Sequence, residues 1–275
     1  VALAREETYS PESRKPNQVI VTSVKDDLSR RDFTVNAIAV SLMKNNFGEI
    51  YDPLNGISDL NKGLLITPKD PDITFSDDPL RMLRAIRFAT TLNFTIDNKI
   101  KDSIKKHFDK LAKSRGAWIK KASGFYEEDI LMMREFVPEN SRVLEIGTGN
   151  GHLLASLKPS YGVGIDISKK MIELAKKKYD SLTFINGDIE DSYCLKKVEG
   201  KFDFIILSDT VGYFYDIEKA FEILHTVCKA DTRLIVAYYS PYWEPLLNLA
   251  TLLKLKMPEL PKALLSEEDI ATLLK

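Results

Sequence analysis

Residues 142–151, with the sequence RVLEIGTGNG, constrain the fold of this chain more than any other stretch. Val143, Leu144 and Ile146 form an apolar run that is too short for a buried helix and suits a strand covered on both faces. Glycines follow at three alternate positions, namely Gly147, Gly149 and Gly151. Glycine permits a sharp strand-to-helix turn in which backbone N–H groups approach a ligand closely. We therefore predict a nucleotide-cofactor loop here.

Acidic residues at the ends of later apolar runs narrow the class of cofactor. The dinucleotide-binding pattern requires glycine or alanine three residues after its second glycine, and that position is His152. The run at 162–165 ends at Asp166, where a carboxylate can accept hydrogen bonds from both hydroxyls of a ribose. The run at 182–185 leads to Asp188 and Ile189. An NAD-binding domain is therefore disfavoured, although a doubly wound domain without a cofactor stays open.

The acid Glu145 before Gly-x-Gly-x-Gly, with acids at the next two strand ends, resembles the class I S-adenosylmethionine-dependent methyltransferases. The resemblance implies a Rossmann-like parallel sheet and places Asp188 beside the adenine amino group. It also implies a set of residues that bind S-adenosylmethionine: Glu145, Gly147, Gly149, Gly151, Asp166, Asp188 and Ile189.

The rest of this half extends the sheet. We expect a fourth parallel strand at 202–208 that ends at Asp209, a helix at 218–228 and a fifth strand at 232–239. Helices are expected at 243–255 and 266–275, and a helix at 126–136 would cap the cofactor pocket in methyltransferases of this type. Asp209 is the candidate catalytic residue, as a contact to the methyl acceptor, with Tyr213, Tyr238 and Tyr239 nearby. The alternative role for Asp209 is to cap the following turn.

Three ordered motifs occupy the first third of the chain, at 30–37 (RRDFTVNA), 51–60 (YDPLNGISDL) and 75–88 (FSDDPLRMLRAIRF). In the third, Ser76 and the acids after it suit a helix cap, and Pro79 suits a first helical turn. Three arginines then recur at every third position, which places Arg81, Arg84 and Arg87 on one stripe. Taken alone, such a stripe indicates a solvated face with salt bridges.

Together these motifs resemble class II tRNA nucleotidyltransferases, the CCA-adding enzymes and their poly(A) polymerase relatives. The resemblance covers the end of the head domain and the neck. It implies that Asp78 and Arg81 read the base of an incoming nucleotide and that the first motif holds its ribose. The nucleotide-binding set of this remnant is thus Arg31, Asp32, Asn36, Asp78, Arg81 and Arg84, with Asp77 where the family usually has glutamate.

Catalysis in that family depends on an Asp-x-Asp pair that binds two magnesium ions. No such pair precedes Arg30, and Asp70 and Asp72 lie in a proline-flanked loop after the ribose motif. We therefore expect no magnesium site, and a nucleotidyltransferase half that is inactive while still able to contact nucleotide or tRNA.

The organisation predicted is an α/β chain of two domains. An amphipathic helix at 95–113 should end at Ser114–Gly116, so that residues 1–113 form a partial α+β head with a helical neck and residues 114–275 form the methyltransferase domain. The first part looks incomplete at its start, and the second lacks the last two strands of its class. We expect an exposed sheet edge near 234–238 that promotes self-association. A fusion of incomplete reading frames stays open.

Composition excludes several classes of protein. A formal net charge of −1 over 275 residues gives no general basic character, so any nucleic-acid contact is local. Cys194 and Cys228 form no Cys-x-x-Cys pair, and the three histidines are scattered, which argues against disulfides, zinc sites and catalytic triads. The longest late apolar run, 246–255, is too short to span a bilayer. We expect a cytoplasmic protein without membrane contact.

The leading hypothesis is methyl transfer from S-adenosylmethionine to an unidentified acceptor by the second domain. The first alternative is a tRNA nucleotidyltransferase fragment that binds nucleotide or RNA. The second is a scaffold in which both halves keep their folds without chemistry. Equilibrium binding of S-adenosylmethionine, ATP, CTP and tRNA would separate the three.

Overall fold

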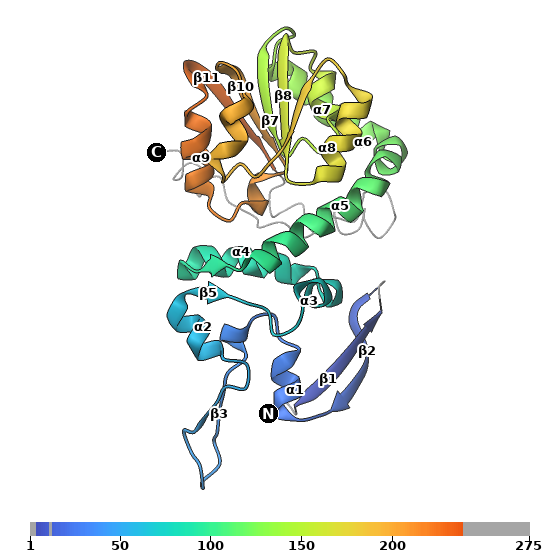
Figure 1. Ribbon diagram of the computed structural model, residues 1–275. Coiled ribbons are helices and arrows are strands. Elements are labelled where there is room, and N and C mark those ends of the chain that lie inside the picture. The colour runs from blue at the N-terminus through green and yellow to red at the C-terminus, as the bar shows by residue number, and fades with distance from the viewer. Residues whose placement is uncertain (1–3, 11–12, 239–275) are drawn as a thin grey trace. The chain divides into compact units, whose positions relative to one another are not determined.

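The computed structural model describes residues 4–10 and 13–238 and divides the chain into two compact units, Val1–Ile104 and Lys105–Lys275 (Figure 1). We call them unit 1 and unit 2. The helix α5 (Asn98–Lys121) begins in unit 1 and continues into unit 2.

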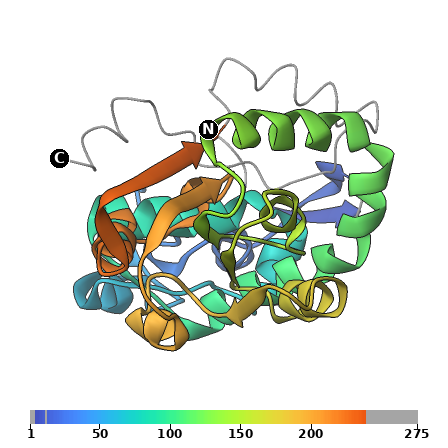
Figure 2. The ribbon, with the colours of Figure 1, turned by 90° about the horizontal axis from the view of Figure 1, so that it is seen from above.

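Unit 2 is built on a parallel five-stranded sheet, which confirms the predicted Rossmann-like class. Its strands are β7 (Arg142–Ile146), β8 (Tyr161–Asp166), β9 (Thr183–Asn186), β10 (Phe202–Ser208) and β11 (Cys228–Ala237). They lie in the order β11-β10-β7-β8-β9, and β10 and β11 run side by side in Figure 2. The strand order reverses between β7 and β10, and ligands of open α/β sheets bind outside the carboxyl ends of the strands at such a point.

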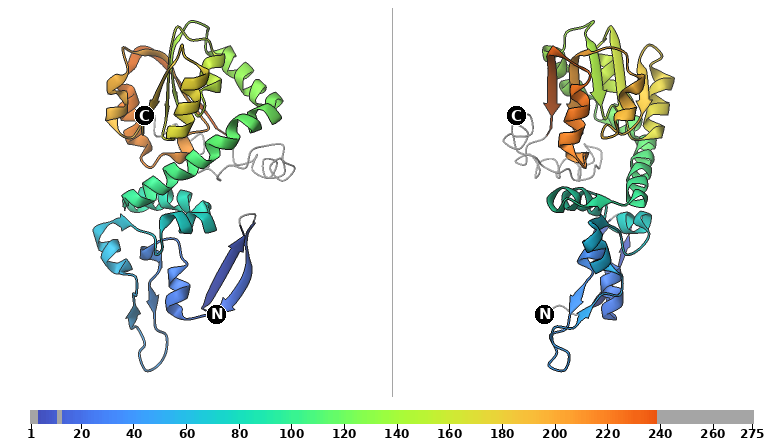
Figure 3. Two further views of the ribbon diagram at one scale, coloured as in Figure 1. Left: turned by 45° about the vertical axis from the view of Figure 1, so that its right-hand side comes forward. Right: turned by 60° about the vertical axis from the view of Figure 1, so that its left-hand side comes forward.

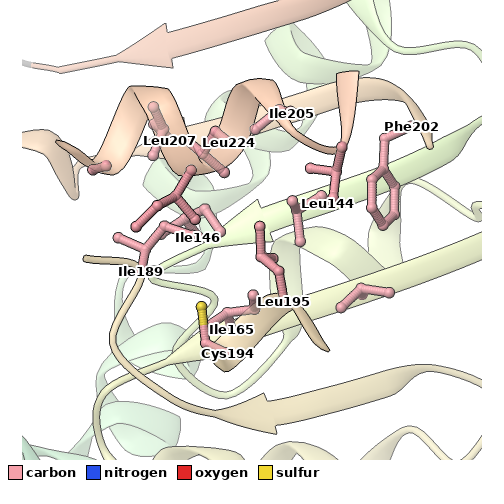
Figure 4. Packing of buried hydrophobic residues seen from close by; sticks show 14 of the residues in the cluster. Leu144, Ile146, Ile165, Ile189, Cys194, Leu195, Phe202, Ile205, Leu207 and Leu224 are labelled. Carbon is pink, nitrogen blue, oxygen red and sulfur yellow. The ribbon is translucent and has the colours of Figure 1, made fainter. Parts of the chain in front are cut away.

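Both faces of this sheet are covered, which explains the continuous apolar runs of its strands. Side chains alternate between the faces, so Leu144 packs with Ile205 and with α9 (Ile217–His225), as Figure 4 shows. Val143 belongs to the opposite face, which is covered by α6 (Ser123–Phe136), α7 (His152–Ser156) and α8 (Lys169–Lys178). Cys194 lies in the first of these clusters as a buried apolar side chain.

Helix α5 departs from the sequence prediction at both ends. The expected break at Ser114–Gly116 is wrong, because α5 continues to Lys121 and the Ser114 hydroxyl donates to Leu111 O at 3.2 Å within the helix. One glycine inside a helix costs about 1 kcal/mol, too little to end a helix of this length. Thr95 and Ile96 form the short strand β6 (Thr95–Ile96) instead of the first helical turn. Among the helices that the structure describes, none combines the length and apolar character needed to cross a membrane.

Other elements of unit 2 follow the prediction with shifted ends. The helix expected at 218–228 is α9, which ends at His225, and Cys228 already belongs to β11. The helices expected at 243–255 and 266–275, and Tyr239, lie outside the described residues. Within the described residues β11 pairs only with β10, so self-association through this edge stays a prediction.

Unit 1 combines small sheets with helices, in agreement with an α+β head. Its first hairpin, β1 (Arg5–Ser10) and β2 (Ser13–Val21), is antiparallel and is visible as a separate ribbon in Figure 3. The elements that follow are α1 (Val24–Ser29), η1 (Thr34–Asn36), β3 (Ala39–Val40), β4 (Ile50–Tyr51), α2 (Gly56–Lys62), β5 (Leu64–Leu65), α3 (Pro71–Asp77) and α4 (Leu80–Leu92).

The helix predicted from the third motif is α4, but its capping residue differs from the expected one. Ser76 and Asp77 lie in the last turn of α3, so their predicted role as a cap is wrong. The carboxylate of Asp78 accepts from Leu80 N at 3.0 Å and caps α4 instead. Asp70 caps α3 by accepting from Asp72 N at 2.8 Å, ahead of a proline in the first turn. The motif therefore spans two helices, because α3 ends at Asp77 and α4 begins at Leu80.

Candidate functional site

The three glycines after β7 have different structural duties. All three lie in the left-handed region, with φ of +72° at Gly147, +54° at Gly149 and +75° at Gly151, where other residues are strained. A Cβ at Gly147 would lie 2.1 Å from Thr210 Oγ1, and one at Gly151 would lie 2.6 Å from the ring of Phe184. A Cβ at Gly149 would meet nothing within 4 Å. The outer glycines are therefore required for packing, and the middle one faces open space that a ligand can enter.

Glu145 is hydrogen-bonded to the glycine turn through its side chain. Its side chain is buried, and Oε2 accepts a hydrogen bond from Thr148 Oγ1 at 2.6 Å. Burial raises the pKa of the Glu145 carboxyl to about 7, and the Thr148 bond opposes part of that shift. Thr148 also packs against Gly164 of β8, where a Cβ would lie 2.7 Å from its methyl carbon. Glu145 thus lies under the loop as a structural acid, and the sequence prediction did not include its partner Thr148.

Asp166 lies at the carboxyl end of β8 and binds the glycine turn directly. Its Oδ2 accepts from Gly149 N and its Oδ1 accepts from Ser168 N, each at 2.8 Å. Burial raises the pKa of Asp166, while these two backbone bonds lower it. A carboxylate offers about four lone-pair sites, so two remain for hydroxyl donors of a ligand.

Asp188 and Ile189 follow the neighbouring strand β9. Asp166 pairs with Asn186 in the adjacent strand, and Asp188 follows Asn186 by two residues. Asp166 and Asp188 therefore lie at the same edge of the sheet. Asp188 Oδ1 accepts from Glu190 N at 3.1 Å, and Ile189 is buried in the sheet core. The Asn186 amide donates to the carbonyls of Asp166 and Ile167 at 2.9 and 3.0 Å and so ties the two strand ends together.

Asp209 lies at the end of β10, on the other side of the strand-order reversal. Its backbone has φ +56°, which is unusual for a residue other than glycine, and its N–H donates to Ala237 O at 2.8 Å. Thr210, which packs over Gly147, donates through its hydroxyl to Ser208 O at 2.9 Å. The predicted cofactor residues and the predicted acceptor residue therefore lie on opposite sides of the strand-order reversal, the place where open α/β sheets have their ligand crevice.

Helix α5 contributes side chains that the sequence prediction missed. Asp109 Oδ1 accepts from Ser168 Oγ at 2.5 Å and from Lys170 N at 3.1 Å, at the start of α8. The ring of Phe108 meets Tyr213 edge-on, with centroids 5.4 Å apart. Contacts with both sides of the crevice are thus made by α5, whereas α6, the helix expected to cap the pocket, buries Met133 in the sheet core.

In unit 1, three of the six predicted nucleotide-binding residues meet around one buried carboxylate. Asp32 is 7% exposed, and its Oδ2 accepts from Arg84 Nε at 2.5 Å. Its Oδ1 accepts from Phe33 N at 3.0 Å and from the Asn36 amide at 3.4 Å. The stripe pattern predicts a solvated position for Arg84, whereas the structure pairs Arg84 with an acid 52 residues away.

The second motif of unit 1 locks against the first. Asp52 accepts from Gly56 N and Ile57 N at 2.7 and 2.9 Å and so fixes the start of α2. A Cβ at Gly56 would lie 2.1 Å from Thr34 O, so only glycine fits there. The Thr34 hydroxyl donates to Asp59 at 2.7 Å in the interior. Two motifs that are separate in sequence therefore form one packed unit.

The other three predicted residues of unit 1 make local contacts. Arg31 lies 3.5 Å from Asp27 on the preceding helix, and Arg81 donates to Thr74 O at 3.4 Å. Asp78 caps α4, as described above. These contacts are made with groups other than Asp32, and the role of the three residues with nucleotides stays a prediction.

Comparison with known proteins gives two separate matches. A family model for a methyltransferase domain matches residues 138–271, and a family model for the poly A polymerase head domain matches residues 1–66. A CCA-adding enzyme of Anoxybacillus flavithermus is 41% identical over 105 residues, which cover 38% of this chain and 25% of that enzyme. The CCA-adding enzyme of Lactobacillus helveticus is 38% identical over 110 residues, which cover 40% and 27%. The chain spans about a quarter of the length of these curated relatives.

Two solved structures are similar to different parts of the chain. A CCA-adding enzyme in an apo form is 36% identical, covers 40% of this chain and 25% of its own, and has a TM-score of 0.36. A SAM-dependent methyltransferase from Thermotoga maritima is 21% identical, covers 61% of this chain and 76% of its own, and has a TM-score of 0.49.

The family matches and the sequence motifs agree that the two halves of the chain resemble two different families. Residues 138–271 of the second unit match the family model for a methyltransferase domain, and the unit has the predicted parallel sheet and glycine turn. The first unit resembles the head of the CCA-adding and poly(A) polymerase enzymes. Both resemblances predicted from the sequence are confirmed.

Proposed function

We propose that unit 2 binds S-adenosylmethionine in the crevice at the strand-order reversal and transfers its methyl group to an acceptor. The observation that carries the proposal is the placement of an open glycine turn beside two acids. Gly149 faces open space, and Asp166 and Asp188 follow neighbouring strands at the same edge. Carboxylates at this edge suit a ligand with two ribose hydroxyls and a positive charge.

Each residue has a distinct duty in this proposal. Asp166 accepts hydrogen bonds from the ribose hydroxyls. It uses the carboxylate lone pairs that are not occupied by Gly149 N and Ser168 N. Asp188 accepts from the adenine amino group, and the buried Ile189 fixes the loop that carries it. The bound cofactor supplies a methyl group activated by its sulfonium. The protein's part is to hold that group in line with the acceptor.

The acceptor side of the crevice is formed by the segment after β10. Asp209 and Tyr213 lie there, with Phe108 against the Tyr213 ring. In this proposal Asp209 contacts the acceptor, and its carboxylate takes a proton where the acceptor must lose one.

Calorimetric titration with S-adenosylmethionine tests the assignment. Asp166→Asn should weaken binding by about tenfold to a hundredfold, the usual range for a lost hydrogen bond to a charged group. Asp180→Asn, an exposed residue after α8, is the matched control and should bind like the unchanged protein. Absence of binding by the folded protein, together with no competition by the demethylated product, would show that the assignment is wrong.

A second candidate function rests on the Asp32 cluster of unit 1. We propose that this cluster binds the ribose of a nucleoside triphosphate, in line with the resemblance to CCA-adding enzymes, and that any tRNA contact lies in the same unit. Arg84→Ala should weaken CTP and ATP binding, and Arg87→Ala, on the same stripe and without the Asp32 bond, should not. Equal binding by both variants would remove this candidate.

A further inference from the structure

Two loops border the crevice of unit 2 from different strands. The loop at 187–191 follows β9 and carries Asp188, which we propose as the adenine acid. The segment at 209–216 follows β10 and carries Asp209 and Tyr213 on the acceptor side. In the sheet, β9 and β10 are separated by β7 and β8, so no ladder bond joins these loops. Their spacing must be set by other contacts.

Glu190 makes such a contact. Its Oε1 accepts from Tyr215 N at 2.6 Å, a short bond between residues 25 positions apart. Its own N–H donates to Asp188 Oδ1 at 3.1 Å, so one residue touches the predicted adenine acid and the acceptor segment. The two loops also pack on the same core, because Ile189 of one loop and Phe214 of the other are buried in the same cluster.

The surroundings of Glu190 are acidic. Asp188 faces it from the loop after β9, and Tyr215 and Asp216 face it from the segment before α9. Burial raises the pKa of Glu190 to about 7, the Tyr215 amide opposes the shift, and the charges of Asp188 and Asp216 add to it. Burial raises the pKa of the Tyr215 phenol, and the charges of Asp188 and Glu190 add to that shift. Glu190 therefore changes its charge near neutral pH, at a place where it holds two loops together.

We propose that Glu190 is a positioning residue that joins the loop carrying Asp188 to the segment 209–216 and so sets the spacing between cofactor and acceptor. The inference rests on the proposed function for the identity of the ligand, but the connection itself rests on the two hydrogen bonds of Glu190. An ionised carboxylate is a stronger acceptor for a backbone N–H than a neutral acid is. The connection is therefore firmer above pH 7 than below it.

This mechanism gives a distinct pH signature. As the pH rises from 6 to 8, Glu190 loses its proton, the Tyr215 bond strengthens and the affinity for S-adenosylmethionine increases by about fivefold. Glu190→Gln keeps an acceptor oxygen and removes this titration, so its affinity should rise less over the same range than that of the unchanged protein, while the titration of Glu145 is common to both. A side chain that merely stabilised the fold would not produce this difference.

Amide hydrogen exchange in the cofactor-free protein tests the connection directly. Glu190→Ala should speed exchange of the Tyr215 amide by about tenfold or more because its acceptor is lost, and Glu190→Gln should retain the protection. Glu222→Gln, on the exposed face of α9, is the control for loss of one charge. Unchanged exchange of the Tyr215 amide in Glu190→Ala would overturn the proposal. If that variant fails to fold, protection that depends on pH in the unchanged protein and not in Glu190→Gln decides in its favour, and identical pH dependence decides against it.

Titration with S-adenosylmethionine at pH 6, 7 and 8 then tests the effect on the site. The unchanged protein and Glu222→Gln should show the full increase with pH, and Glu190→Gln should show a smaller one. The same pH dependence in Glu190→Gln would overturn the role of Glu190 in positioning. A folded protein that binds no S-adenosylmethionine at any pH would overturn the proposed function instead, and the exchange experiment would still decide whether Glu190 joins the two loops.

Discussion

The acids at the candidate sites of the two units are stabilised in different ways. In unit 1, Asp32 lies against the guanidinium of Arg84, so a buried negative charge has a cationic partner. In unit 2, Glu145 accepts from a hydroxyl, and Asp166 and Glu190 accept from backbone amides. Burial raises the pKa of all three acids of unit 2.

The difference separates two ways of building a polar site. The Asp32 cluster is held by an ion pair between side chains 52 residues apart. The crevice of unit 2 is held by backbone geometry at the ends of parallel strands, with glycines where a Cβ would collide. Burial penalises the charged form of these acids, and at Glu145 and Asp166 hydrogen bonds and the charge of Arg115 offset part of that penalty.

The largest test of this comparison changes the backbone geometry of unit 2. Gly151→Ala should lower the free energy of unfolding of unit 2 by about 3 kcal/mol, because it adds left-handed strain and an overlap with Phe184. Gly149→Ala is the matched control, with the same strain and open space, and should cost about 1 kcal/mol. Urea unfolding followed by circular dichroism measures both. Equal losses would show that packing around Gly151 is unimportant.

The second test concerns the cost of burying the carboxylate of Glu145. A raised pKa of about 7 for Glu145 means that the folded state holds its proton up to higher pH than the unfolded chain does. Its contribution to stability therefore falls as the pH rises from about 4.5 to 7. Glu145→Gln should be more stable than the unchanged protein by about 2–3 kcal/mol at pH 8, and the gain should shrink towards pH 5.

Urea unfolding at pH 5, 6.5 and 8 measures this effect. Glu173→Gln, at an exposed position of α8, serves as the control and should show no such trend. A gain for Glu145→Gln that is the same at every pH would contradict the proposed origin in the titration of this carboxyl.

The third test removes the cation of unit 1. Arg84→Ala should lower the stability of unit 1 by about 1–2 kcal/mol, because Asp32 keeps its buried charge, while the partial exposure of Arg84 limits the loss. Arg87→Ala loses a similar contact with the Phe88 ring and no ion pair, so it should cost only a few tenths of a kcal/mol. Thermal unfolding of the two variants compares them, and similar midpoints would contradict the asymmetry.

The smallest effect is expected where neither kind of site is involved. Gly116 lies inside α5, and a Cβ there would meet nothing within 4 Å. Gly116→Ala should therefore raise stability by about 0.5–1 kcal/mol through its better helix propensity. A loss of stability in the same unfolding assay would indicate that the helix is interrupted at this position after all.

The sequence predicted the sheet and its glycine turn because that information is local. The run ending at Ile146, the turn at Gly147 and the acid at Asp166 each follow from spacing within a few residues. The bond between Asp109 and Ser168 joins residues 59 positions apart, and no periodic pattern announces it. The expected helix break failed for the opposite reason, because local glycine propensity at Gly116 was given more weight than the length of the helix around it. The pairing of Asp32 with Arg84 required the fold, although both residues were already candidates.

Helix α5 has a practical consequence for anyone who wishes to study the units separately. It is 24 residues long, and the division between the units falls after Ile104, inside the helix. A fragment starting at residue 114 would begin in mid-helix and would lack both Phe108 and Asp109, which contact the borders of the crevice. An expression boundary before Asn98 keeps the whole helix. A cleavage site within α5 beyond Asp109 would separate Phe108 and Asp109 from the residues that they contact, Tyr213 and Ser168.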